Sequence, residues 1–97
     1  MASSVRIDKW LWHARFYKSR ARAQEAAASG LIRLNGVRVE KPGANVTAGD
    51  VLTLPRGRDI VAVRIEALAV RRGPAVEAQT LYKILGEAPL DPEPRAS

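Results

Sequence analysis

The residues whose types suggest chemistry lie around position 20. Ser19 stands where a helix N-cap is expected, and Arg20 and Arg22 follow in the first helical turn. Positive charge there opposes the helix macrodipole, at a cost of about 0.3 to 1 kcal/mol per residue. A bound phosphate would reverse that cost, because backbone N–H groups, the Ser19 hydroxyl and both guanidinium groups would contact one anion. Arg15 and Lys18 could reach neighbouring phosphates, so the segment predicts a phosphate-binding site, with solvated surface charge as the alternative.

The positive charge of the chain is concentrated in its first 41 residues. The net charge is +6, and this segment holds nine Lys and Arg residues against three Asp and Glu residues. The remaining 56 residues carry seven of each sign. Such a concentration is typical of a surface that binds a polyanion, so we expect a nucleic acid as the partner. The alternative, an anionic membrane surface, would require a basic helix with a broad apolar face free to insert.

Aromatic residues gather in the same segment, since four of the five in the chain are Trp10, Trp12, Phe16 and Tyr17. Helical spacing places Trp10 on an apolar stripe, so we expect it in the core. Trp12 lies off that stripe. It could stack on an unpaired base, which is worth roughly 1 to 3 kcal/mol, or it could pack under a strand or the C-terminal segment.

Residue types that carry catalysis or bind metals are scarce. The chain has no cysteine and one histidine, His13, which has no partner for a metal site or a catalytic dyad. We expect His13 at the surface, beside the bound nucleic acid or solvent. Asp8 is expected to cap a helix or to pair with an arginine, and no two carboxylates form an acid/base arrangement. We therefore predict no enzymatic activity, no metal, no cofactor and no small-molecule substrate.

Two helices must position these residues. A helix over residues 6 to about 16 is predicted from apolar residues at helical spacing, namely Ile7, Trp10, Leu11 and Ala14. Basic residues lie along one edge of that stripe: Arg6, Lys9 and His13. A second helix is predicted from Arg20 to Ser29, with Ser19 as its N-cap and Gly30 at the C′ position. Its five alanines leave little bulk, so it can pack close to a neighbour.

Strands are predicted after Gly30. Segments 31–34 and 37–39 flank Asn35-Gly36, which is typical of a two-residue hairpin turn. Four polar residues would lie on or beside this hairpin and could extend the phosphate-binding surface: Arg33, Asn35, Arg38 and Lys41.

Further strands are predicted over 51–54 and 60–70, joined by a loop at 55–59. Alternation in the second predicts one buried and one exposed face. A short final helix is predicted from Pro74 to Gly86, with Pro74 in its first turn. We expect residues 1–5 to form a tail, 6–86 to form a single domain, and the proline-rich 87–97 to be disordered.

The pattern resembles the RNA-binding domain first seen in small-subunit ribosomal protein S-four, and within that superfamily the bacterial heat-shock proteins of fifteen kilodaltons. The resemblance rests on several segments: Arg6 to Trp12, Ala14 to Ala21, Gly30, Asn35-Gly36, Lys41-Pro42 and Gly49-Asp50. The C-terminal signature of the heat-shock subfamily is similar to Arg72 to Ala75, Glu77-Ala78 and Leu81-Tyr82. The resemblance implies an α+β fold in which a two-helix RNA-binding motif packs on a small, mostly antiparallel sheet (the alpha-L motif).

The same resemblance implies an RNA-binding site and a partner. Carried onto matching positions, the site consists of Arg6, Lys9, Arg15, Lys18, Ser19, Arg20, Arg22, Arg33, Asn35 and Arg38. The implied partner is structured RNA of the large ribosomal subunit, bound by a non-catalytic factor that acts in the rescue of stalled subunits under heat stress.

Other functions remain to be weighed. Domains of this type also occur appended to pseudouridine synthases and a tRNA synthetase, but the 97 residues leave no room for a catalytic domain. A DNA-binding or protein-interaction adaptor is a further alternative, although none of the common DNA-binding signatures is evident. Without cysteines, a signal sequence or a long apolar run, we expect a cytoplasmic protein. We expect a monomer, because the basic face would repel a copy of itself.

Overall fold

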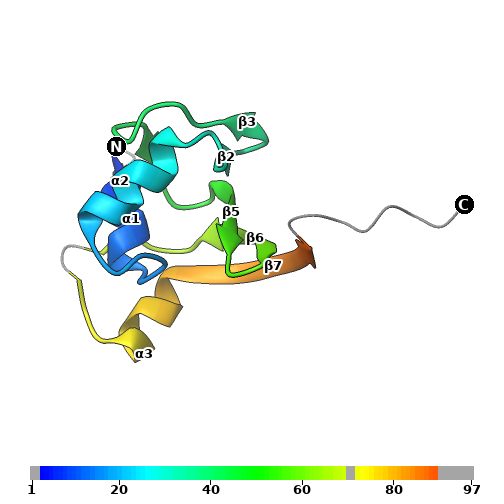
Figure 1. Ribbon diagram of the computed structural model, residues 1–97. Coiled ribbons are helices and arrows are strands. Elements are labelled where there is room, and N and C mark those ends of the chain that lie inside the picture. The colour runs from blue at the N-terminus through cyan, green and yellow to red at the C-terminus, as the bar shows by residue number, and fades with distance from the viewer. Residues whose placement is uncertain (1–2, 70–71, 90–97) are drawn as a thin grey trace, which may run out of the picture.

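Two helices pack beside two antiparallel sheets (Figure 1), in a computed structural model that describes residues 3–69 and 72–89. The helical elements are α1 (Ile7–His13), α2 (Arg20–Ala28), α3 (Ala75–Ala78) and the 3-10 turn η1 (Gln79–Leu81). The smaller sheet pairs β1 (Val5–Arg6) with β4 (Asn45–Val46). The larger sheet has the order β3 (Val37–Arg38), β2 (Arg33–Leu34), β5 (Val51–Arg56), β6 (Asp59–Ile65) and β7 (Tyr82–Pro89). The predicted α+β class and the pair of helices against an antiparallel sheet are confirmed.

Helix α1 is shorter than predicted at both ends. Arg6 belongs to β1 and serves as the N-cap in an extended conformation. At the other end, Arg15 adopts a left-handed φ of 64°. The Arg15 N–H donates to the Trp12 carbonyl at 3.1 Å and the Phe16 N–H donates to the Leu11 carbonyl at 3.1 Å. These two bonds form a Schellman motif, which ends the helix even though no glycine is present.

Helix α2 begins at Arg20, as predicted, and ends at Ala28, one residue before the predicted end. The Ser19 hydroxyl oxygen accepts a hydrogen bond from the Arg22 N–H at 3.1 Å, a cap worth about 1 kcal/mol. After Ala28 and the C-cap Ser29, Gly30 has a φ of 83°. Ala23 and Ala27, one turn apart, are fully buried against the core. The small methyl groups thus let α2 lie directly against its neighbours.

The predicted hairpin forms, with shorter strands than expected. Asn35 and Gly36 have φ values of 51° and 84°, as a type I′ turn requires. The Asn35 N–H donates to the Val51 carbonyl at 2.7 Å, which continues the pairing of β2 with β5. The hairpin is thereby fixed to the centre of the larger sheet.

One core lies between the helix pair and the larger sheet. Alternate residues of β6, namely Val61, Val63 and Ile65, are fully buried, as the sequence pattern predicted. They pack in one cluster with Trp10 and Leu11 of α1. The Trp10 indole N–H donates to the Ala67 carbonyl at 3.0 Å, so even the polar atom of this large side chain is satisfied.

The C-terminal predictions were partly wrong. Strand β6 ends at Ile65, not at residue 70, and its pairing includes Asp59, which was assigned to a loop. The predicted helix over 74–86 contains only α3 and η1, and Tyr82–Pro89 forms strand β7. The exposed edge of β6 needs a hydrogen-bonding partner, and β7 pairs with it over seven positions from Tyr82 to Pro89. Sheet pairing overrides the helical spacing of a few apolar residues.

The predicted domain boundaries shift as well. Val5, assigned to an N-terminal tail, lies in β1 opposite Val46. Residues 87–89, assigned to a disordered tail, form the end of β7. The rest of that predicted tail lies outside the described residues.

Candidate nucleic-acid interface

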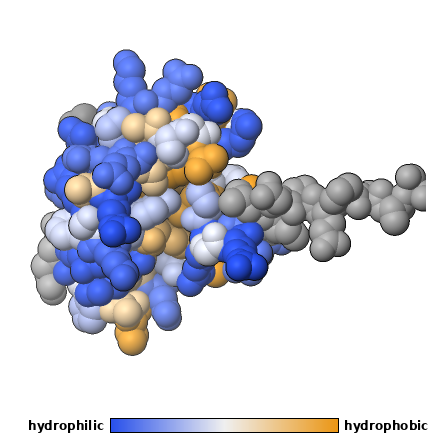
Figure 2. Space-filling model, viewed as in Figure 1, coloured by the Kyte–Doolittle hydropathy of each residue, from blue (hydrophilic) through white to orange (hydrophobic). Residues whose placement is uncertain are grey.

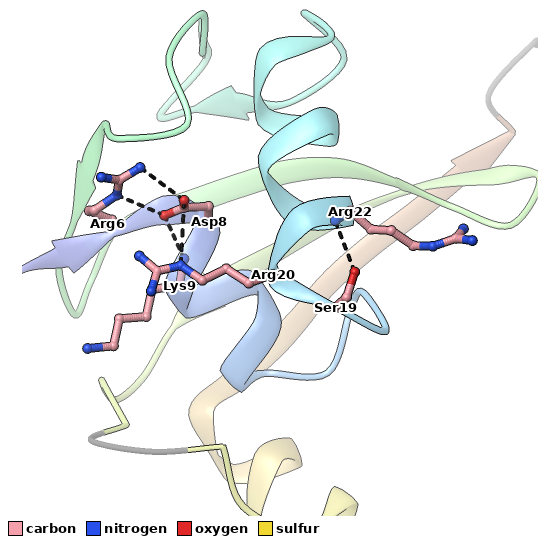
Figure 3. A network of polar contacts seen from close by, with 6 residues as sticks. All are labelled: Arg6, Asp8, Lys9, Ser19, Arg20 and Arg22. Atoms are coloured by element: carbon pink, nitrogen blue, oxygen red, sulfur yellow. Dashed lines mark hydrogen bonds and ion pairs between the residues drawn. The ribbon is translucent and has the colours of Figure 1, made fainter.

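A buried carboxylate lies at the centre of the basic helix surface (Figure 3). Asp8 is fully buried and accepts hydrogen bonds from Arg6 Nε at 3.2 Å, Arg6 Nη2 at 3.1 Å and the Lys9 N–H at 2.8 Å. Arg20 Nε lies 3.8 Å from Asp8 Oδ2. The predicted ion pair of Asp8 with an arginine is confirmed. Arg6, Asp8, Lys9 and Arg20 are called the Asp8 cluster below.

The Asp8 cluster holds its carboxylate in the charged form. Burial alone would raise the pKa of Asp8, but hydrogen bonds from Arg6, Gln24 and the Lys9 N–H outweigh it and lower the pKa below its ordinary value. Arg6 and Arg20 keep 48% and 40% of their side chains exposed. The carboxylate therefore hydrogen-bonds Arg6 and forms a longer ion pair with Arg20, whose Nε is buried and has no hydrogen-bond partner among the described residues.

The N-terminus of α2 combines fixed dipoles with mobile charge. The Ser19 oxygen uses the Arg22 N–H, and helix geometry leaves the N–H groups of Arg20 and Ala21 without intrahelical partners. Figure 3 shows the Arg20 side chain extending toward Asp8 and the Arg22 side chain extending away from it. Lys18, just before the cap, is exposed. These groups can bind phosphates on both sides of the helix end.

Arg15 lies apart from the Asp8 cluster and has a structural bond of its own. Its Nε donates to the Gly73 carbonyl at 2.8 Å, which ties the end of α1 to the segment before α3. Arg15 is exposed overall. Its left-handed backbone costs an ordinary side chain roughly 1 kcal/mol or more relative to glycine, so the arginine is kept there at a cost.

The hairpin residues lie toward the opposite end of α2. Arg38 Nε donates to the Gly30 carbonyl at 3.2 Å, and Arg33 Nη1 lies 3.5 Å from the Gly36 carbonyl. Both arginines are exposed. Nine residues of helix separate the Ser19 cap from this end, about 13 Å at 1.5 Å per residue. The structure thus arranges the basic residues in two groups, one at each end of α2.

Asn35 has an internal role that the sequence did not predict. Its side-chain NH₂ donates to Asp50 Oδ1 at 3.1 Å, and its side-chain oxygen accepts from the Val51 N–H at 2.9 Å. Asp50 in turn accepts from the Thr47 N–H at 2.9 Å. The amide therefore joins the hairpin turn to the loop before β5.

The prediction that His13 lies at the surface was wrong. Only 2% of the residue is exposed. Burial and the nearby charges of Lys9, Arg20 and Arg72 lower the pKa of His13 below 6.5, although a hydrogen bond with the Ala69 backbone acts in the opposite direction. The ring is thus neutral near pH 7. A neutral ring under a basic surface avoids adding a further buried positive charge.

Trp12 packs against the protein itself, as the second of its two predicted roles required, and is not left free as a base-stacking platform. It is partly buried, and the Arg72 guanidinium lies over its ring at 5.6 Å from the centroid. Arg72 Nε also donates to the Trp12 carbonyl at 3.2 Å. The sequence analysis did not place Arg72 in the site. Arg72 lies 60 residues after Trp12, so no local pattern indicates the contact. Arg72 adds a cation next to α1.

The surface around these residues is hydrophilic. In Figure 2 hydrophilic residues cover the side of the molecule formed by α1 and α2, and hydrophobic residues reach the surface between that side and the strands. Within residues 3–69 and 72–89 no cluster of three or more His, Asp or Glu side chains could hold a metal ion. No helix in the described part of the chain is long and apolar enough to cross a membrane.

Comparisons with known proteins agree on one family. The model of the S4 domain matches residues 5–52. Heat shock protein 15 of Escherichia coli K12 is 45% identical over 87 residues, which are 90% of this chain and 65% of that protein. The RQC P-site tRNA stabilizing factor of Listeria innocua is 41% identical over 91 residues, 94% of this chain and 97% of that factor. The chain thus spans slightly less than two thirds of the first relative and nearly all of the second.

A solved structure supports the fold. The trimeric structure of heat shock protein 15 from Vibrio cholerae superposes with a TM-score of 0.80 at 43% sequence identity. The match covers 84% of this chain and 82% of that one. The likeness extends beyond the S4 domain match, because it must include part of the C-terminal third.

Proposed function

This chain belongs to the S4 domain family, and we propose on that basis that it binds structured RNA on the ribosome as a non-catalytic factor. The observation that carries the proposal is the Asp8 cluster beside the Ser19 cap. Two arginines held by one buried carboxylate, next to unpartnered N–H groups of a helix end, form a preorganised site for adjacent phosphates.

The proposed site contains the ten residues that the sequence indicated. Nine of them are basic or cap α2, while Asn35 has its amide engaged with Asp50 and Val51. We therefore expect Asn35 to orient the hairpin and Arg33 and Arg38 to contact RNA. Arg72, which covers Trp12, joins the set as an eleventh residue.

Large-subunit ribosomal RNA is the proposed target. Relatives named as a heat shock protein and as an RQC P-site tRNA stabilizing factor support a role on the ribosome. We propose that this role is on stalled large subunits, including under heat stress. Co-sedimentation tests this: we expect stronger binding to large subunits that carry a peptidyl-tRNA than to vacant ones. Equal binding to small and large subunits would contradict the proposed target while leaving RNA binding intact.

Arg22→Glu tests RNA binding itself. The variant should weaken binding to a ribosomal RNA fragment roughly tenfold and lower the salt dependence, because at least one phosphate contact is replaced by repulsion. Lys83→Glu is the matched control, since Lys83 is exposed on β7, at the opposite edge of the sheet from β3, and the charge change is the same. Equal weakening by both variants would reduce the interaction to attraction by net charge.

A DNA-binding adaptor is the alternative, and the same titration distinguishes it. We expect folded RNA to bind more tightly than a DNA duplex of equal length throughout a salt series. The monomeric state is also a proposal, since the Vibrio cholerae relative is described as trimeric. Light scattering of the purified chain at several concentrations measures it directly.

A further inference from the structure

An open groove of about 380 Å³ lies between α2 and the β5–β6 turn, outside the Asp8 cluster. The residues that matter in its lining are Tyr17, Arg22, Glu25, Ala26, Leu31 and Pro55. The volume is in the range of sites that hold small ligands, roughly 300 to 1,000 Å³.

Helix α2 separates this groove from the Asp8 cluster. Arg22, Glu25 and Ala26 follow at helical spacing and line the groove, whereas Arg20 and Gln24 face Asp8. Figure 3 shows Arg22 on the side of α2 away from Arg20. One phosphate-binding helix end therefore adjoins an apolar groove on one side and a fixed arginine pair on the other.

The walls of the groove suit a flat ring. Leu31 is 58% exposed, which leaves an aliphatic side chain in water unless something covers it. Tyr17 and Pro55 offer further flat, largely apolar surface, and partial burial raises the pKa of the Tyr17 hydroxyl, so the ring stays neutral. Aromatic and apolar walls beside an arginine are the setting in which proteins stack unpaired bases.

Glu25 is the unusual member of the groove. It is the only acidic residue between Lys9 and Glu40, and it is exposed. Among the described residues it takes part in none of the ion pairs. A carboxylate repels phosphate, but it accepts hydrogen bonds well from the exocyclic amino group of a base.

We propose that this groove binds a single nucleobase that is turned out of the RNA, with Arg22 on its phosphate and Glu25 on its exocyclic amino group. The inference rests on the proposed RNA-binding function and specifies it further. Adenine, cytosine and guanine offer an amino group, and uracil does not. The groove therefore reads a base, while the Asp8 cluster contacts the backbone.

The test is a titration of the full ¹⁵N-labelled chain, followed by amide chemical shifts. The probes are cytidine, adenosine and uridine 5′-monophosphates and ribose 5-phosphate. Cytidine and adenosine monophosphates should shift the amides around Glu25, Leu31 and Gly57, with affinities roughly three- to tenfold above that of uridine monophosphate. Ribose 5-phosphate should shift only the amides around Ser19 and Arg22.

Glu25→Gln supplies the specificity control. It should remove the preference for cytidine over uridine, whereas Glu87→Gln, the same change at an exposed site on β7, should keep it. Identical shifts with all four probes, or no shift near Leu31 with any of them, would overturn the base-binding groove. A ribosomal RNA titration of the same sample tests the proposed function separately, because RNA binding with no base preference contradicts only the groove.

Discussion

Two arginine–carboxylate pairs in this chain have the same spacing and nearly the same geometry, yet different surroundings. Arg6 binds Asp8 through Nε and Nη2 at 3.2 and 3.1 Å, and Arg64 binds Glu66 through the same atoms at 3.0 and 3.3 Å. Asp8 is fully buried, whereas Glu66 has 40% of its side chain exposed. The comparison teaches that burial of the acid, not the bond lengths, separates a structural cluster from a surface pair.

Removing the charge of the buried acid should have the largest effect. Asp8→Asn leaves Arg6 and Arg20 without their anion, and we expect the free energy of unfolding to fall by about 1 to 3 kcal/mol. Both arginines are half exposed and can be hydrated, which limits the loss. Urea denaturation measures it.

The matched control is Glu66→Gln, which should leave the denaturation midpoint unchanged because both partners of that pair reach solvent. Equal losses of unfolding free energy in the two variants would contradict the comparison, because burial of Asp8 would then add no stability beyond that of the exposed pair.

Acid should act next, through two buried titratable groups, Asp8 and His13. The pKa of Asp8 is lowered in the folded chain, so its stabilisation is complete above the unfolded value of 3.8 and is lost as pH falls through the folded value. The pKa of His13 is also lowered, so the unfolded chain takes up a proton first and stability already declines below about pH 6.5.

Melting temperatures between pH 7 and 3 check both statements. Asp8→Asn should flatten the curve in the range below pH 4, and His13→Phe should flatten it just below pH 6.5. A curve for either variant that parallels the unsubstituted chain would exclude that residue as the source.

The smallest effect is expected at Arg15, which binds a carbonyl in place of a carboxylate. Arg15→Ala keeps the left-handed backbone and loses the bond to Gly73, so we expect a loss of about 1 kcal/mol. Arg15→Gly loses the same bond but relieves the backbone, and the two changes should nearly cancel. Thermal denaturation of the pair measures the difference, and a glycine variant less stable than the alanine variant would contradict it.

Local signals allowed part of the fold to be predicted. Ser19 and Gly30 delimit α2 because caps act through adjacent atoms, and Asn35-Gly36 makes its turn because both residues tolerate positive φ. The residues of β7 could not be assigned, because Leu81, Tyr82 and Leu85 fit helical spacing and only the open edge of β6 decides between helix and strand.

The site shows the same division. The pairing of Asp8 with an arginine follows from residues two positions apart, and so was predicted. Burial of His13 and the covering of Trp12 depend on Ala69 and Arg72, more than 50 residues away. The groove beside Glu25 likewise needs the β5–β6 turn, which no pattern within α2 reveals.

The long-range bonds to α1 also set an order of assembly during synthesis. Trp10, Arg15 and the Trp12 carbonyl bind partners 57, 58 and 60 residues farther along the chain. At about 5 to 20 residues per second, those partners are added roughly 3 to 12 s after α1. The basic helix pair is therefore synthesised first, but its long-range hydrogen bonds form last. A nascent chain that ends at residue 52, the limit of the S4 domain match, still lacks all three bonds.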